Sequence, residues 1–207
     1  MEEDMLNVVG IGPGNDGYIT EVGKKIIAES DVLIGGKRNL EIFENFCGEK
    51  IVLGANLVEI KNYINENIEK NITVIASGDP SVYGIGKYLS KNVDNEKMEI
   101  IPGISSMQYM FSRIKVDMND LYMTSSHGRE PDFDYLLSHS KVCMVTDSKI
   151  GPREIAREII KRDLKKTMAV GENLSYDNEK ITIGKPEDIL KIEKYDMNIV
   201  VILDDEQ

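Results

Sequence analysis

The sequence of 207 residues is short of several residue types, and each shortage excludes a class of protein. It has no tryptophan, two cysteines, Cys47 and Cys143, and two histidines, His127 and His139. Because the cysteines stand far apart and form no C-x-x-C pair, we expect neither a disulfide framework nor an intrinsic zinc site. The sequence therefore predicts no bound metal of its own, and a metal would arrive only as part of a ligand.

Long apolar runs and an excess of positive charge are also missing. No uninterrupted apolar run reaches the roughly 18 residues that cross a bilayer, and the N-terminus "MEEDMLNVVG" is acidic where a signal peptide would be basic. We therefore expect a cytoplasmic protein with no membrane partner. The formal net charge of −11 disfavours nucleic acid, since phosphate binding needs a surplus of Lys and Arg on one face. A small molecule is the expected ligand.

The first half of the chain alternates short hydrophobic segments with segments of helical period. Helices are expected at 20–30, where Thr20 can act as N-cap, and at 57–70. The β-branched segments typical of buried strands are 5–11, 31–35, 50–53, 72–76 and 98–102. This alternation predicts a parallel sheet covered by helices on both faces.

A second α/β pattern follows a polar stretch, "IKVDMN", at 114–119. It has an amphipathic helix at 153–163. Its expected strands are 121–126, 141–146, 167–170, 180–184 and 198–203. We expect two α/β domains, 1–115 and 116–207, which need not share a topology because the sequence shows no internal repeat.

The stretch "VVGIGPGNDG" at 8–17 satisfies the dinucleotide-binding pattern G-x-G-x-x-G through Gly12, Gly14 and Gly17. Pro13, however, removes one of the amide donors that would face a pyrophosphate. The next strand ends in "LIGGKR", without the acid that would hold a ribose. These departures disfavour an NAD(P)-dependent oxidoreductase, and a plain strand-to-loop turn is the simpler interpretation of this stretch alone.

Two further loops follow strands of the same predicted sheet. "ASGDPSVYG" at 76–84 follows the fourth strand, and "IPGISSMQYMFSRI" at 101–114 follows the fifth. Carboxyl ends of parallel strands are where ligands collect, so the three loops are expected to share one edge. Taken singly, Asp-Pro and Pro-Gly are common turn pairs and Ser is a common N-cap.

Taken together and in order, "GIGPGN", "SGDPSVYG" and "PGISS" resemble the signature loops of the tetrapyrrole (corrin and porphyrin) methylases. The resemblance spans nearly the whole chain. It implies two α/β domains with a cleft between them that holds S-adenosylmethionine. "DVLIGGKRNLEIF", "PGISSMQYMFSRI" and "SSHGR" resemble most the branch of anaerobic cobalamin synthesis that methylates carbon 5 of a cobalt-containing ring.

The resemblance also implies which residues hold the cofactor. Pro13 would touch it from the first loop, Asp79 would suit its ammonium group, and Val82 would line the pocket beside that group. Thr146 and Leu174 of the second domain would enclose the adenine. The full implied cofactor set is Pro13, Ser77, Gly78, Asp79, Val82, Ser105, Ser106, Thr146 and Leu174.

The implied substrate is a ring edged with carboxylates, so its pocket should offer cationic groups for paired hydrogen bonds. The candidates are Lys37, Arg38 and Arg129, and His127 could orient a carboxylate or accept a proton. Ordinary solvated charge is the alternative for each cation, and a hydrogen-bonded loop residue is the alternative for His127.

The implied reaction is an in-line displacement in which a ring carbon attacks the sulfonium methyl. It needs alignment and exclusion of water rather than a nucleophilic side chain, so no catalytic residue is assigned. A sister methylase for another ring carbon or a cobalt-free precorrin, a dinucleotide oxidoreductase and a non-catalytic binding protein are the alternatives. By resemblance we also expect a homodimer, and a separate decarboxylating C15-methyltransferase as a partner enzyme.

Overall fold

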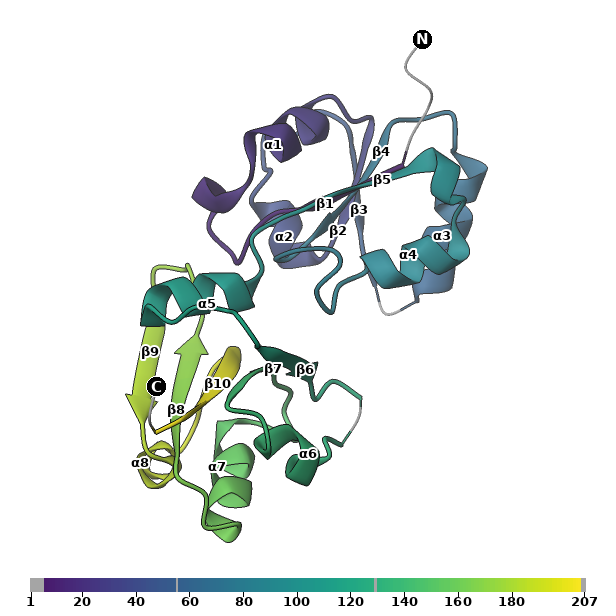
Figure 1. Ribbon diagram of the computed structural model, residues 1–207. Coiled ribbons are helices and arrows are strands. Elements are labelled where there is room, and N and C mark those ends of the chain that lie inside the picture. Colours follow the sequence, from purple (N-terminus) through teal and green to yellow (C-terminus); the bar gives the residue numbers. More distant parts are fainter. Residues whose placement is uncertain (1–5, 55, 129, 206–207) are drawn as a thin grey trace. The chain divides into compact units, whose positions relative to one another are not determined.

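The chain folds into two compact units in a computed structural model that describes residues 6–54, 56–128 and 130–205. The units are Met1–Ser105 and Ser106–Gln207, and each contains a five-stranded sheet with helices (Figure 1). The predicted fold class, two α/β domains, is therefore confirmed.

The sheet of the first unit is entirely parallel. Its strands are β1 (Leu6–Gly10), β2 (Val32–Gly35), β3 (Glu49–Val52), β4 (Ile72–Ala76) and β5 (Met98–Ile101). They lie in the order β3-β2-β4-β1-β5, and every pairing is parallel. Each strand overlaps a hydrophobic segment from which it was predicted.

Helices cover both faces of this sheet, as its near-continuous apolar strands predict. The helical segments of the unit are η1 (Asp16–Tyr18), α1 (Glu21–Ala28), α2 (Lys37–Glu41), α3 (Leu57–Glu66), α4 (Gly86–Asn92) and η2 (Asn95–Lys97). On one face Val8 of β1 shares a buried cluster with Ile64 of α3 and Leu89 of α4. On the other face Val9, the next residue of β1, shares a cluster with Ile27 of α1 and Leu40 of α2 (Figure 1).

Local hydrogen bonds set the ends of the two predicted helices. The Thr20 hydroxyl accepts a bond from the Gly23 amide at 3.1 Å, so α1 begins at Glu21 as expected for an N-cap. Helix α3 ends at Glu66, short of the predicted residue 70. There the Tyr63 carbonyl accepts both from the backbone amide of Asn67 at 3.1 Å and from its side-chain amide at 2.9 Å, which closes the last turn.

The second unit has a different topology. Its strands are β6 (Tyr122–Ser125), β7 (Lys141–Val145), β8 (Lys166–Glu172), β9 (Lys180–Gly184) and β10 (Asn198–Asp204). Their order is β6-β7-β10-β8-β9; β6 and β7 are parallel and the other pairings are antiparallel. The helices are α5 (Ser106–Ile114), α6 (Phe133–Leu137), α7 (Pro152–Lys161) and α8 (Pro186–Lys191).

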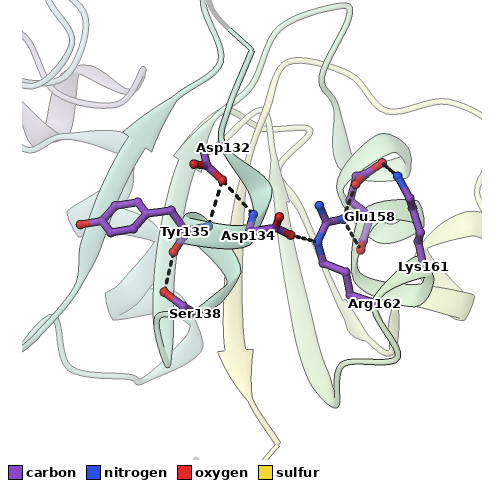
Figure 2. A network of polar contacts seen from close by, with 7 residues as sticks. All are labelled: Asp132, Asp134, Tyr135, Ser138, Glu158, Lys161 and Arg162. Atoms are coloured by element: carbon purple, nitrogen blue, oxygen red, sulfur yellow. Dashed lines mark hydrogen bonds and ion pairs between the residues drawn. The ribbon is translucent and has the colours of Figure 1, made fainter.

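Helices α6 and α7 are joined by a surface network of polar contacts (Figure 2). The Arg162 guanidinium, directly after α7, donates to Asp134 of α6 at 2.6 Å and also to Glu158 of α7. Asp132 caps α6 by accepting from the amides of Asp134 and Tyr135, both at 3.1 Å. Beneath this network the apolar side of α7 packs into the buried core of the unit.

The compact units divide before α5, whereas the predicted domain boundary at 115/116 lies after it. Contacts explain the difference. Arg113 of α5 donates to Glu179 at 2.8 Å, within the second unit. The Lys141 ammonium of β7 holds the segment after α5 by donating to the carbonyls of Asp117 and Asn119 at 2.9 and 3.2 Å. The polar stretch that suggested a linker is therefore a fixed turn of the second unit.

Candidate active site

Three loops of the first unit meet at one edge of its sheet. Strands β4, β1 and β5 are neighbours and run parallel, so the segments after their carboxyl ends lie side by side. We call residues 11–20, 77–85 and 102–105 the rim loops. This is the edge at which parallel sheets bind ligands, and the three predicted signature motifs lie in it.

The first two rim loops are joined through their backbones. The amide of Gly78 donates to the carbonyl of Gly12 at 2.7 Å, and the amide of Gly12 donates back at 3.3 Å. Both residues have positive φ, 80° at Gly12 and 68° at Gly78, a conformation that favours glycine. The glycines of "GIGPG" and "SGDP" therefore shape a contact between loops.

The three loops also approach one another too closely for side chains. A Cβ at Gly10 would lie 2.6 Å from the Gly103 nitrogen and 2.6 Å from the Gly78 carbonyl oxygen. A Cβ at Gly103 would lie 2.2 Å from that same oxygen. These are backbone atoms, which cannot move aside as a flexible side chain can, so glycine is required at both positions.

The glycine pattern does not form a dinucleotide site. The Gly12 amide bonds to Gly78, the Gly17 amide donates to the side chain of Asn15 at 2.8 Å, and Pro13 has no amide hydrogen. The 3₁₀-helix η1 separates these residues from α1, and β2 ends in glycine without a following acid. The amides that would face a pyrophosphate are thus used within the loops.

Asp79 is the buried charged residue of the rim loops. Its carboxylate accepts hydrogen bonds from the amides of Ser81 at 2.7 Å and Gly103 at 3.1 Å, and a further one from the Ser81 hydroxyl. The side chain therefore reaches from the second rim loop to the third. Sequence spacing could not have indicated this contact, because Gly103 follows Asp79 only after α4 and β5.

The other predicted cofactor residues of this region lie in or beside the rim loops. Pro13 is buried, Val82 is half-buried, and Ser105 is buried directly before Ser106 begins α5. Ser77 is exposed, and its hydroxyl donates to the side-chain carbonyl of Asn39 on α2 at 3.1 Å. Asn39 was not among the predicted site residues.

Thr146 and Leu174 lie at one edge of the second sheet. Both β7 and β8 are antiparallel to β10, so their carboxyl ends, which Thr146 and Leu174 follow, point the same way. The Thr146 hydroxyl lies 2.9 Å from the side-chain oxygen of Asn198 at the start of β10. Leu174 is buried and packs against Gly171. Asn198, which fixes the Thr146 hydroxyl, was missed by the sequence analysis.

Glu172, at the end of β8, is a buried carboxylate near this edge that was also missed. One of its oxygens accepts from the Asp196 amide at 3.0 Å. The other lies 3.5 Å from the Lys180 ammonium and has no hydrogen-bond donor among the described residues. Burial, together with the charge of Glu172, raises the pKa of Tyr195 to about 12.

The predicted substrate residues are distributed over both units. Lys37 and Arg38 are exposed in the first turn of α2, where Lys37 lines a cavity of about 370 Å³ with Glu41, Glu44 and Lys50 among its neighbours. His127 is exposed in the second unit, and Arg129 lies outside the described residues.

A larger pocket of about 580 Å³ lies beyond the ends of β6 and β7 in the second unit. It is lined by Ser126, Gly128, Glu130, Asp147, Ser148, Lys149 and Ile150. The backbone amides of Ile150 and Lys149 donate to Asp147, and they and the nearby His127 hold the pKa of its carboxyl below the usual value. His127 in turn places its Nδ1 3.3 Å from the Ser125 hydroxyl. Ser126 and Gly128 of the "SSHGR" stretch thus line a pocket of ligand size.

Within the described ranges, no helix has the length and apolar character needed to cross a bilayer. The same residues contain no group of three or more His, Cys, Asp or Glu side chains that could hold a metal ion.

Comparison with known proteins identifies the class. The family model of the Tetrapyrrole (Corrin/Porphyrin) Methylases matches residues 5–190. The chain is 45% identical over 202 residues to the cobalt-precorrin-7 C(5)-methyltransferase of Salmonella typhimurium, covering 97% of this chain and all of the relative. It is 36% identical to the probable cobalt-precorrin-7 C(5)-methyltransferase of Methanocaldococcus jannaschii, covering 89% of this chain and 91% of the relative.

The fold agrees with a solved structure of similar length. The crystal structure of the cobalamin biosynthesis precorrin-6Y methylase from Archaeoglobus fulgidus matches with a TM-score of 0.78 and 27% identity, covering 98% of this chain and 99% of that one. These findings define an α/β methyltransferase. The chain belongs to the tetrapyrrole methylase family, as the three loop motifs predicted.

Proposed function

We propose that this chain transfers a methyl group from S-adenosylmethionine to carbon 5 of cobalt-precorrin-7 in cobalamin biosynthesis. The observation that carries the proposal is the 45% identity, over 97% of the chain, to a relative named for that reaction. The substrate-side stretch "SSHGR" and the cofactor-side loops both lie within the matched length.

The rim loops fit a methyl donor of this kind. Their close backbone contacts at Gly10, Gly78 and Gly103 hold the three loops in one fixed arrangement, beside which the proposal places the cofactor. When bound, S-adenosylmethionine supplies an electrophilic methyl group on a sulfonium. In the proposal Pro13, Ser77, Gly78 and Val82 contact the cofactor directly, with Ser105 and Ser106 beside them. Thr146 and Leu174 enclose its adenine, and the contribution of Asp79 is argued below.

The protein's part in this reaction is to hold two reactants in line. Orientation of this kind can lower a barrier by roughly 7–11 kcal/mol without a covalent step on the protein. Fixed groups serve that purpose: the Thr146 hydroxyl is held by Asn198, and the Ser77 hydroxyl by Asn39. Each of these hydroxyls is thus oriented by a side chain of its own unit.

On the substrate side, Lys37, Arg38, His127 and Arg129 are the proposed partners of the ring carboxylates. Guanidinium groups suit carboxylates because they donate two parallel hydrogen bonds. The pocket beside His127 also contains Lys149, a further cation that the sequence analysis did not single out.

Assembly and location complete the proposal. We expect a cytoplasmic homodimer, and a separate decarboxylating C15-methyltransferase acting on the same corrinoid pathway. Light scattering at micromolar protein tests the dimer, and a mass corresponding to 23.3 kDa at all concentrations would contradict it.

The reaction is tested by anaerobic incubation of the protein with methyl-labelled S-adenosylmethionine and cobalt-precorrin-7. We expect one labelled methyl group per ring, located at carbon 5 by NMR. A methyl group on another carbon would keep the family and overturn the substrate assignment. Turnover only with a cobalt-free ring would assign the chain to a sister reaction.

A further inference from the structure

Asp79 occupies an unusual position for a residue expected to bind a ligand. The residue is 9% exposed, and each of its two carboxylate oxygens already accepts at least one hydrogen bond from the protein. One oxygen takes both the amide and the hydroxyl of Ser81, and the other takes the amide of Gly103. Hydrogen bonds from amides to a carboxylate are charge-assisted and strong.

Through its hydrogen bond with the Gly103 amide, the Asp79 carboxylate affects the packing of all three rim loops. Gly103 belongs to the third loop, and its nitrogen would lie 2.6 Å from a Cβ on Gly10 at the end of β1. The Gly78 oxygen would lie equally close to that Cβ. Gly78 in turn bonds to Gly12 of the first loop. A shift of Gly103 would therefore change the packing of both other loops.

We propose that Asp79 is a positioning residue, which acts on the cofactor through the backbones of Gly103 and Ser81 and not through an ion pair with the cofactor's ammonium group. This inference rests on the proposed function, because it concerns how the same site is held. It differs from direct recognition in a measurable way. A positioning residue affects every ligand of the loops, whereas an ammonium partner affects only ligands that carry the amino group.

The test compares S-adenosylhomocysteine with its analogue lacking the α-amino group, by calorimetry on the full chain. In Asp79→Asn one carboxylate oxygen becomes an amide nitrogen, so the side chain keeps a single acceptor and loses the bonds either from Gly103 or from Ser81. We expect affinity for both ligands to fall by the same factor, at least about tenfold. A loss for S-adenosylhomocysteine with little or no loss for the analogue would overturn the proposal.

Two further variants separate positioning from misfolding. Ser81→Ala removes one hydroxyl bond to Asp79 and keeps the carboxylate, so it should weaken both ligands by a smaller equal factor. Glu66→Gln makes the same carboxylate-to-amide change at an exposed site on α3 and should leave both affinities unchanged. Unaltered affinity in Ser81→Ala together with a ligand-selective loss in Asp79→Asn would count against the role.

A ligand-free measurement keeps the inference separate from the proposed function. The Gly103 amide proton should resonate at low field in the ¹H–¹⁵N spectrum, and Asp79→Ala, which removes both acceptor oxygens, should move it upfield while the Glu66→Gln spectrum matches wild type at this residue. If the wild-type chain binds neither ligand, the proposed function fails and the Gly103 resonance alone decides whether Asp79 holds this loop. An unmoved Gly103 resonance would overturn the positioning role.

Discussion

Gly12 and Gly78 hydrogen-bond to each other through their backbones, with the Gly78 amide 2.7 Å from the Gly12 carbonyl oxygen. This contact explains why the first loop satisfies a dinucleotide pattern without being a dinucleotide site. Its glycines are required for contact between loops, and the amide of Gly12 is used there. The G-x-G-x-x-G pattern is thus explained here by contact between loops and not by pyrophosphate binding.

The close approach of the rim loops predicts a severe effect of Gly10→Ala. The added methyl group would lie 2.6 Å from backbone atoms of Gly103 and Gly78, so the loops must separate. We expect a loss of roughly 1–3 kcal/mol in the free energy of unfolding, as for overpacking in a core. Calorimetry should also show at least tenfold weaker binding of S-adenosylhomocysteine, about 1.4 kcal/mol.

The matched control is Gly54→Ala. Gly54 is exposed, and a Cβ there would meet no atom within 4 Å. The unfolding midpoint of the Gly54→Ala variant should stay close to that of the wild-type chain. If Gly10→Ala behaves like Gly54→Ala in both stability and binding, the loops are looser than their contacts indicate.

The hydrogen bonds of Lys141 should stabilise the protein by holding the segment that follows α5. Its buried ammonium donates to the Asp117 and Asn119 carbonyls and to the Asp117 carboxylate. Lys141→Met leaves these carbonyls without their donor, so we expect a loss of about 1–3 kcal/mol in the free energy of unfolding by urea. Lys165→Met, at an exposed position before β8, is the control and should be near neutral. Equal midpoints for the two variants would disprove the role of Lys141.

The ionisation of Asp117 should make the stability of the protein depend on pH. The Lys141 ammonium, followed by the Asn119 amide, holds the pKa of the Asp117 carboxyl below its ordinary value. A carboxyl whose pKa is depressed on folding stabilises the protein above its unfolded pKa, about 3.9, and loses that contribution as the pH falls through the folded pKa. Asp117→Asn should therefore destabilise the chain at pH 6 and progressively less below pH 4. Urea midpoints that differ from wild type by a constant amount at all pH values would contradict this.

The sequence predicted the sheets better than the connections between them. Strands such as β4 are continuous buried runs, and burial on both faces leaves a clear signal in composition. Helix α2, of five residues, was not predicted, because a segment so short shows little periodicity and its Gly36 cap makes no side-chain hydrogen bond. The predicted domain boundary rested on the polarity of the Asp117 segment, and one sequence carries no signal for the hydrogen bonds by which Lys141 ties that segment to β7.

The predicted site residues come from recognisable motifs, whereas the contacts that the fold makes between residues far apart in sequence left no such sign. Pro13 and Ser77 lie in recognisable loop sequences. Asn198 reaches Thr146, and Gly103 reaches Asp79, only through sheet topology, since β10 lies between β7 and β8 and β5 lies beside β1. One sequence carries no signal for such pairs.

The last prediction concerns Arg129, whose sequence neighbours Gly128 and Glu130 help to line the pocket of the second unit. If it binds a ring carboxylate, Arg129→Ala should raise the KM for cobalt-precorrin-7 about ten- to a hundredfold, because one charge-assisted contact of roughly 1.5–3 kcal/mol is lost. Its affinity for S-adenosylhomocysteine should be unchanged. Arg157→Ala removes the same side chain from α7, where the guanidinium pairs with Glu154 at 2.6 Å on the surface, and should leave both constants unchanged. Equal weakening of cofactor and substrate in Arg129→Ala would mean that the residue supports the fold of the second unit, and the carboxylate partners would then have to be sought at Lys37, Arg38 or Lys149.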